Sequence, residues 1–187
     1  MSLTKNNLMT EIIEPNNREE LLTVLNHSHR EIADFVQSVE EENFGMRRDD
    51  KWSIGENLEH LILSHKGIIS VTGKPKSIFA PFGKAERPSG TFSEITDRYH
   101  NKLSGGLKAP SKFSPDPDAP KSKTELLAGW KMLSQKLAAR LPENWTEADL
   151  DTYQLPHPAF GMLTMREMLY FIIFHNGHHL NAMKKNV

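Results

Sequence analysis

A group of histidines near the end of the chain has the spacing of a metal site: the run at 175–179 reads His-Asn-Gly-His-His. Residues four apart on a helix lie about 40° apart and one turn along its axis, so His175 and His179 can bind one ion together. Neutral imidazoles in this arrangement suit zinc, nickel, iron or copper. Met168 and Ile172 fall on the same side of the expected helix, which predicts that the pair faces inward.

Spacing alone leaves two other interpretations of this cluster open. His178 could replace His179, because residues three apart on a helix also face each other. The cluster could also be a tag remnant or a solvated helix end that binds nothing. Asn176 and Gly177 interrupt it, and it continues an apolar helix rather than a linker, which argues against a tag. Metal binding and a solvated helix end are then about equally compatible with the spacing.

A site for a single ion needs a third ligand, and the segment that follows Trp52 offers His60 and His65. Hydrophobic periodicity favours His65, which shares an apolar stripe with Leu58 and Leu61. His60 lies outside the centre of that stripe. On periodicity alone, the third ligand would be His65.

Four amphipathic segments must position these side chains, and each follows a helix-capping signal. In each signal a Ser, Thr or Asn side chain can accept a hydrogen bond from a free backbone N–H of the helix. A Glu three residues later can accept one from the backbone N–H of the capping residue. Helices are therefore expected over about 18–42, 54–71, 123–141 and 165–184, with Pro142 ending the third. The four signals are Asn17 with Glu20, Ser53 with Glu56, Ser122 with Glu125, and Thr164 with Glu167.

The stretch at 72–121 is different, because it holds seven of the eleven prolines. We expect a long crossover there with one short helix at about 92–103, and such a crossover permits parallel neighbours in a bundle. The segment 151–161 is expected to be a loop that could fold over one end of the bundle, since no segment shows a clear strand pattern. The predicted fold class is all-α, a four-helix bundle with a long Pro/Gly-rich crossover between helices two and three. It would occupy residues 17–187, after an N-terminal tail at 1–16.

Composition excludes several classes of protein. The 187 residues include 23 basic and 24 acidic side chains, a formal net charge of −1, so no strong field would attract nucleic acid or an anionic membrane. Cysteine is absent, which excludes disulfides, a Cys-ligated zinc site and a cysteine nucleophile. No apolar run reaches the length of a membrane span, and the first ten residues lack the apolar stretch of a signal peptide, so a cytoplasmic location is expected.

Two parts of the chain resemble signatures of the DinB-like superfamily. The segment at 51–61, Lys-Trp-Ser-Ile-Gly-Glu-Asn-Leu-Glu-His-Leu, is similar to its second-helix signature. The segments at 157–161, 163–167 and 175–179 are together similar to its last loop and last helix. The family consists of damage-inducible, metal-binding four-helix bundles, and the resemblance extends from about residue 19 to residue 182.

The resemblance implies a set of metal ligands. The family pattern places one ligand eight residues after the tryptophan, which is His60 here, and two more at His175 and His179. It thus favours His60 over His65, and it implies that helix two is covered on more than one side. Three His ligands leave one coordination position for water, as in catalytic metal sites. The implied cofactor is a divalent metal ion, with zinc or nickel first.

The resemblance also implies a function on a small-molecule substrate. Several relatives transfer a low-molecular-weight thiol to an electrophile and others resemble hydrolases, so the expected activity is that of a metal-dependent thiol S-transferase or hydrolase. The Pro-rich crossover departs from the better-known thiol-transferase members. The alternative is a non-catalytic, stress-related metal-binding or interaction protein whose ion stabilises the bundle. In that case the crossover could serve to form a homodimer.

Neighbours of the histidines are further candidates. Asn57 and Asn176 could orient the ligands through hydrogen bonds. Trp52 is interpreted as a packing residue at the start of helix two rather than a substrate platform. Glu59 could be a base, although a solvated carboxylate is the simpler interpretation. His157 could line the mouth of a pocket, although an ordinary loop residue is again simpler.

Overall fold

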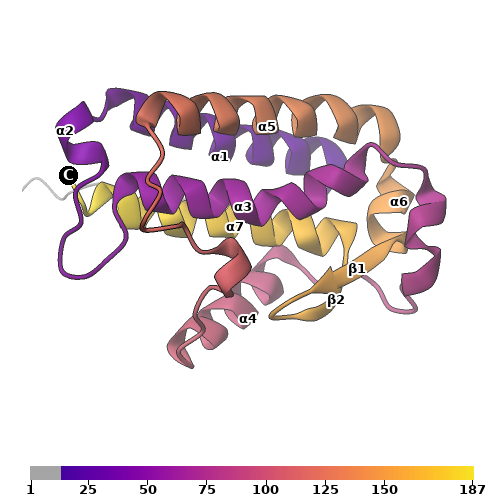
Figure 1. Ribbon diagram of the computed structural model, residues 1–187. Coiled ribbons are helices and arrows are strands. Elements are labelled where there is room, and N and C mark those ends of the chain that lie inside the picture. The colour runs from indigo at the N-terminus through magenta and orange to yellow at the C-terminus, as the bar shows by residue number, and fades with distance from the viewer. Residues whose placement is uncertain (1–13) are drawn as a thin grey trace, which may run out of the picture.

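Four long helices lie side by side in the computed structural model, which describes residues 14–187 (Figure 1). They are α1 (Arg18–Ser38), α3 (Ile54–Thr72), α5 (Lys123–Asn144) and α7 (Met165–Lys184). Both α1 and α3 pack against α5 and α7, so the four helices close around one apolar core. The predicted all-α four-helix bundle is confirmed.

Each bundle helix begins at the capping residue that the sequence predicts. The side chains of Asn17, Ser53, Ser122 and Thr164 all accept from the backbone N–H three residues later. At Ser53 and Thr164 the Glu three residues later also accepts from the backbone N–H of the cap, which completes a capping box. Because these caps satisfy N–H groups that the helix leaves unpaired, they locate the helix starts well. The last helix also has the predicted end, at Lys184.

The first helix is shorter than predicted. It ends at Ser38 instead of reaching residue 42, and a separate helical turn, α2 (Glu41–Phe44), follows it. Val39 has an extended backbone and is buried, so the chain turns there. The turn brings the Phe44 ring against Gly55, where an added Cβ would lie only 2.9 Å from that ring. Tertiary packing on α3 therefore ends the helical pattern early.

The third predicted helix is longer than expected, because α5 continues through Pro142 to Asn144. The next residue, Trp145, is buried, and its backbone N–H donates to the carbonyl oxygen of Leu141. Its indole Nε1 donates to the carbonyl oxygen of Thr72 at 2.9 Å. These contacts anchor the last turn and outweigh the single helical hydrogen bond that proline cannot make.

Helices α3 and α5 are neighbours that run in the same direction. Lys121, just before α5, donates to Glu59 near the start of α3. Arg140 and Trp145, at the other end of α5, donate to backbone carbonyls near the end of α3. Two consecutive bundle helices can be parallel neighbours only if the chain between them returns along the bundle. The crossover makes this return.

The crossover contains the short helix that the sequence predicts. It is α4 (Phe92–Ser104), which is capped by Thr91 and packs against α7. Two 3-10 helices flank it along the chain, η1 (Lys76–Phe82) and η2 (Ser111–Phe113), and η2 lies against α3. Helix α3 is therefore covered by the crossover as well as by α5 and α7.

The segment predicted to be a loop at 151–161 forms part of a small sheet instead. After α6 (Glu147–Thr152), β1 (Gln154–His157) pairs antiparallel with β2 (Gly161–Thr164), and His157 is opposite Gly161. Gly161 has φ of +72°, a left-handed conformation that glycine adopts without steric cost. Strands of four residues are too short to show clear alternation, and a proline inside β1 obscures it further.

Of the predicted tail at 1–16, only residues 14–16 belong to the described part of the chain. Within it Pro15 is buried, and its carbonyl oxygen accepts from the hydroxyl of Tyr170 in α7. Between residues 14 and 187, no helix is both long enough and apolar enough to cross a bilayer.

Glu167 joins the crossover to the start of α7. Its carboxylate accepts from Arg87 at 2.5 and 2.8 Å and from the backbone N–H groups of Gly90 and Thr164. Burial alone would raise the pKa of Glu167, but these donors outweigh it and hold the pKa below its ordinary value of 4.5. The ionised carboxylate therefore stabilises the folded state.

We predict that Glu167→Gln lowers the free energy of unfolding by about 1–3 kcal/mol at neutral pH. Because folding lowers the pKa of Glu167, its contribution is fully present above pH 4.5 and is lost as the pH falls through the folded-state value. Urea unfolding at neutral and acidic pH checks this, since the difference from wild type should shrink in acid. The control is Glu94→Gln, which removes the corresponding capping carboxylate of the more exposed α4. It should lower the free energy of unfolding by less. Equal losses in both variants would contradict the prediction.

Candidate metal centre

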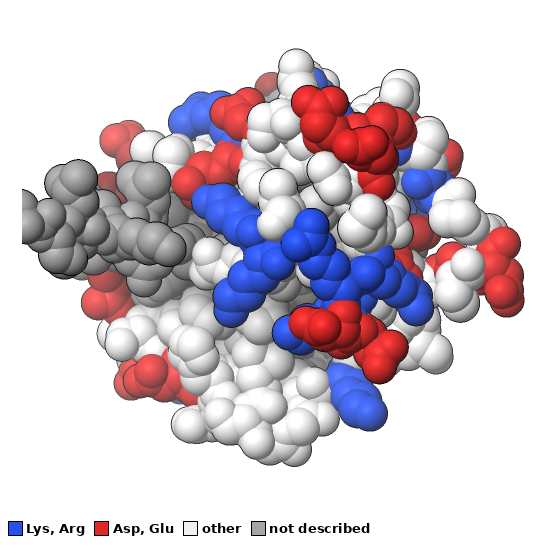
Figure 2. Space-filling view, turned by 90° about the vertical axis from the view of Figure 1, so that its left-hand side faces the viewer, with Lys and Arg blue, Asp and Glu red and all other residues white. Residues whose placement is uncertain are grey.

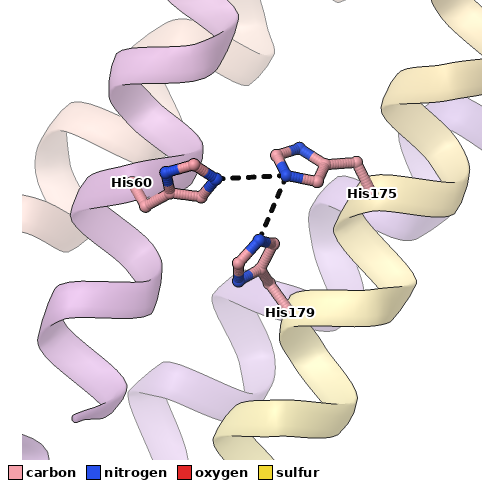
Figure 3. Close-up of side chains that lie close together, drawn as sticks. All are labelled: His60, His175 and His179. Atoms are coloured by element: carbon pink, nitrogen blue, oxygen red, sulfur yellow. Dashed lines mark hydrogen bonds between the residues drawn. The ribbon is translucent and has the colours of Figure 1, made fainter. Parts of the chain in front are cut away.

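The three histidines of the predicted ligand set converge between α3 and α7 (Figure 3). His60 comes from α3, and His175 and His179 come from successive turns of α7. The Nε2 atom of His175 lies 3.1 Å from the Nε2 atom of His60 and 3.1 Å from that of His179. Ligand atoms of all three lie within 4.8 Å of one another, and all three side chains are buried.

The crossover fixes the orientation of the His60 ring. The Nδ1 atom of His60 donates to the backbone carbonyl oxygen of Phe113 in η2 at 2.8 Å. A carbonyl oxygen can only accept, so the proton lies on Nδ1 and the Nε2 atom keeps a lone pair that faces His175. The same contact explains why His60 is buried although it lies outside the apolar stripe of its helix.

Asn57 fixes the orientation of the His179 ring in the same way. The Nδ1 atom of His179 donates to the Oδ1 atom of Asn57 at 2.8 Å. The Nδ2 atom of Asn57 donates to the carbonyl oxygens of Trp52 and Ser53 at 3.0 and 2.8 Å, which determines which way the amide points. The Nε2 atom of His179 is therefore also unprotonated. The expectation that Asn57 could orient a histidine agrees with this contact.

The three nitrogen atoms fit a cation better than a proton. Since the Nε2 atoms of His60 and His179 both lack a proton, one proton on the Nε2 atom of His175 could serve only one of the two 3.1 Å contacts. A cation would accept lone pairs from all three nitrogens at once. Nitrogens bound at ~2.0–2.1 Å to the corners of a tetrahedron lie about 3.3 Å apart, close to the spacing found here.

Burial keeps these imidazoles neutral. Loss of hydration lowers the pKa of His60, and it lowers the pKa values of His175 and His179 to well below the ordinary value of 6.5. The neighbouring imidazoles lower the pKa of His175 further. The ring of Phe171 stacks on that of His175 with centroids 5.0 Å apart and shields it from water. The neutral form is the one that binds metal ions.

His65 belongs to the opposite side of α3. Its Nδ1 atom donates to the carbonyl oxygen of Leu61, and its ring packs 5.4 Å from Trp130 and 5.8 Å from His29. It is only 1% exposed. The apolar stripe thus identifies the side of α3 that faces α1 and α5, whereas His60 lies on the side that faces α7 and the crossover.

The remaining candidates lie outside the cluster of three. Asn176 donates to the hydroxyl of Ser28 in α1. Glu59 is buried and paired with Lys121, so it is not the solvated carboxylate of the simpler interpretation. His178 lies beside the cluster, with its ring 5.0 Å from that of His179.

A cavity of about 1010 Å³ opens beside the three histidines, a volume that suits a small molecule. Trp52 and Tyr99 form part of its wall, with rings 5.0 Å from His60 and 5.9 Å from His175. His157 of the hairpin lines the same cavity. Sequence reasoning missed Tyr99, Phe113 and Phe171, because each belongs to a segment whose pattern carries no chemical signal.

Fold and site together define a class: a four-helix bundle with a long crossover and three converging histidines beside a cavity. The chain belongs to the DinB superfamily, whose family model matches residues 25–183. The family resemblance found in the sequence is therefore confirmed.

Two similar proteins, YuaE and YfiT, are known from Bacillus subtilis. The uncharacterized protein YuaE of strain 168 is 26% identical over 172 residues, which cover 88% of this chain and 95% of YuaE. YfiT, described as "a probable metal-dependent hydrolase with an unusual four-helix bundle topology", has a TM-score of 0.55 at 17% identity, over 90% of this chain and 84% of YfiT. The colibactin self-resistance protein ClbS, solved in complex with double-stranded DNA, has a TM-score of 0.50 at 16% identity, over 91% of this chain and 97% of ClbS. These two structures share the fold.

Proposed function

We propose that His60, His175 and His179 bind one divalent metal ion through their Nε2 atoms. The observation that carries this proposal is the pair of tautomers fixed by Phe113 and Asn57, both of which leave a lone pair facing the Nε2 atom of His175. Imidazole nitrogens suit zinc and nickel, whereas calcium and magnesium prefer oxygen ligands. Of the ions that imidazole suits, we propose zinc or nickel, which the family resemblance puts first.

We further propose that the site is catalytic and that the protein is a metal-dependent hydrolase or a transferase of a low-molecular-weight thiol. Three protein ligands leave one position for a substrate atom, as in catalytic metal sites. When bound, the ion would supply Lewis acidity, which lowers the pKa of a water ligand to about 7 or favours a thiolate. The adjoining cavity and the description of YfiT as "a probable metal-dependent hydrolase" support a small-molecule hydrolase first.

His157 would help to hold the substrate in this cavity. The Nδ1 atom of His157 accepts from the backbone N–H of Ala159 at 3.1 Å, so the proton of the neutral ring lies on Nε2. Burial lowers the pKa of His157 to about 4, and the charge of Arg98 adds to this effect. The ring is therefore neutral at physiological pH and offers a hydrogen-bond donor that can bind a substrate carbonyl or anion.

Activity screens on untagged protein loaded with zinc or nickel test the catalytic proposal. One panel holds esters and amides, and the other pairs low-molecular-weight thiols with an alkylating electrophile. Metal-dependent hydrolysis that His175→Ala lacks would establish a hydrolase, and metal-dependent loss of thiol would establish the transferase. Equal turnover by the loaded wild type and the variant would contradict a catalytic role for the site.

Asn57→Leu should weaken metal binding about 10–100-fold, the usual effect of removing a group that orients a metal ligand. The variant removes the oxygen that holds the Nδ1 proton of His179, so the Nε2 lone pair is no longer kept in place. Competition with a chromogenic chelator measures the affinity. Asn181→Leu is the control: it is the same change at a cavity residue of α7, and within residues 14–187 the hydrogen bonds of the three histidines do not involve Asn181. Unchanged affinity in Asn57→Leu would show that its hydrogen bond does not orient the ligand.

Three expectations from the sequence stay predictions: a cytoplasmic location, a possible homodimer and the lack of nucleic-acid binding. ClbS was solved with DNA, but at 16% identity the similarity shows only that the two chains share a fold. Direct titration with a DNA duplex would decide the last of them.

A further inference from the structure

The mouth of the cavity has a strongly uneven charge. Four lysines line it, Lys51, Lys108, Lys112 and Lys185, against one carboxylate, Asp50. All four are exposed, and within residues 14–187 none of them forms an ion pair. The mouth therefore has an excess of positive charge, although the whole chain has a net charge of −1.

Basic side chains also gather on one end face of the bundle. Figure 2 shows Lys and Arg side chains gathered near the middle of the end face of the bundle that carries the carboxyl terminus. Two basic residues outside the cavity lining are paired with carboxylates: Arg47 with Glu56, and Lys121 with Glu59. In the part of the chain that the structure describes, the four lysines of the cavity lack such partners, so they are available to a bound molecule.

Two of these lysines lie next to the histidine cluster. Lys112 precedes Phe113, whose carbonyl orients His60, and its Nζ atom lies 4.8 Å from the centre of the Phe113 ring. Lys185 follows the last residue of α7, the helix that carries His175 and His179, and it lines the same cavity. Because both lysines line the cavity that the three histidines line, a molecule whose anionic group binds to these lysines can extend toward the histidines.

Part of the cavity wall is apolar. An apolar body would be favoured there because it releases water from hydrocarbon and aromatic surface. The aromatic and aliphatic side chains of the wall are Ile68, Leu103, Leu107, Phe113, Phe171 and Phe174.

We infer that the substrate is an amphipathic anion. Its apolar body would occupy the cavity, its reacting end would face the three histidines, and its carboxylate, phosphate or sulfonate would be held at the mouth by Lys112 and Lys185. The inference rests on the proposed function for the reacting end only, because binding of the body and of the anionic group needs no metal ion.

A matched pair of fluorescent probes tests this on metal-free protein. The anionic probe is 1-anilinonaphthalene-8-sulfonate, and the neutral one is N-phenyl-1-naphthylamine, which has the same rings without the sulfonate. The double substitution Lys112→Gln/Lys185→Gln should weaken binding of the anion about tenfold and leave the neutral probe unaffected. Salt near 1 M should reduce the wild-type preference for the anion, because it screens exposed charges beyond about 3 Å. Lys136→Gln, at an exposed position of α5 away from the cavity, is the control.

Three results would overturn the inference. The first is equal affinity of the wild type for both probes. The second is a loss of affinity for the anionic probe in Lys136→Gln that equals the loss in the double variant. The third is displacement of the anionic probe by a short DNA duplex at physiological salt. The last would assign the lysines to a nucleic acid instead. Because the protein is free of metal, failure here leaves the metal site intact as a proposal, whereas a protein that prefers the anion but binds no metal would overturn the proposed function alone.

Discussion

Replacing His175 by Ala should abolish metal binding, with a loss of affinity of more than about 100-fold, because even groups that only orient a ligand contribute up to that factor. The Nε2 atom of His175 lies 3.1 Å from both other Nε2 atoms, so its loss removes the middle member of the three. Single substitutions of His60 and His179 by Ala should have the same effect. Metal analysis of dialysed protein, with titration by zinc and nickel, measures it.

His178→Ala is the matched control, since His178 adjoins the cluster in sequence and in space but lies outside it. It should bind metal like the wild type. His65→Ala should also keep the metal, although it removes a buried ring and should lower the stability. Full occupancy in His60→Ala together with loss in His65→Ala would show that the third ligand lies on the other side of α3.

Chelation of the metal should eliminate the activity while leaving the helices intact. A chain of 187 residues can bury a core without an ion, unlike a small zinc finger. The core is continuous through all four bundle helices, and the histidines lie between only two of them. Far-UV circular dichroism and thermal unfolding should therefore show a folded, cooperative protein with a lower midpoint, because a bound ion stabilises the state that binds it.

Collapse of the helical signal on chelation would mean that the ion serves the fold rather than chemistry. The proposal of a non-catalytic protein with a stabilising ion would then replace that of an enzyme. Restoring the metal should return full activity to the chelated protein. Its failure to do so while the fold is intact would also contradict a catalytic ion.

The helix starts were predictable because their signals are local. A cap and the carboxylate three residues later lie within one turn, as at Ser53 and Thr164. The end of the first helix and the continuation of α5 through Pro142 were not predictable, since both depend on distant contacts. The packing of the Phe44 ring on Gly55 ends the first helix early. The hydrogen bond from Trp145 to the carbonyl oxygen of Thr72 helps to extend α5.

The candidate site was predictable in part for the same reason. His175 and His179 share one helix, so their spacing alone brings them together. His60 is separated from His175 by 115 residues and from Phe113 by 53 residues, and no local pattern could place these groups in contact. Periodicity favoured His65 because it detects the side of a helix that faces the apolar core. The family resemblance supplied His60, which the structure places beside the other two histidines.

The most direct test of the central claim is a diffraction experiment on crystals of protein loaded with zinc or nickel, with data collected on both sides of the absorption edge of the metal. We predict one anomalous peak per chain, about 2.0–2.1 Å from the Nε2 atoms of His60, His175 and His179 and with its remaining position open to the cavity. A peak among other residues, or no peak between these three histidines in protein that has retained its metal, would contradict the account.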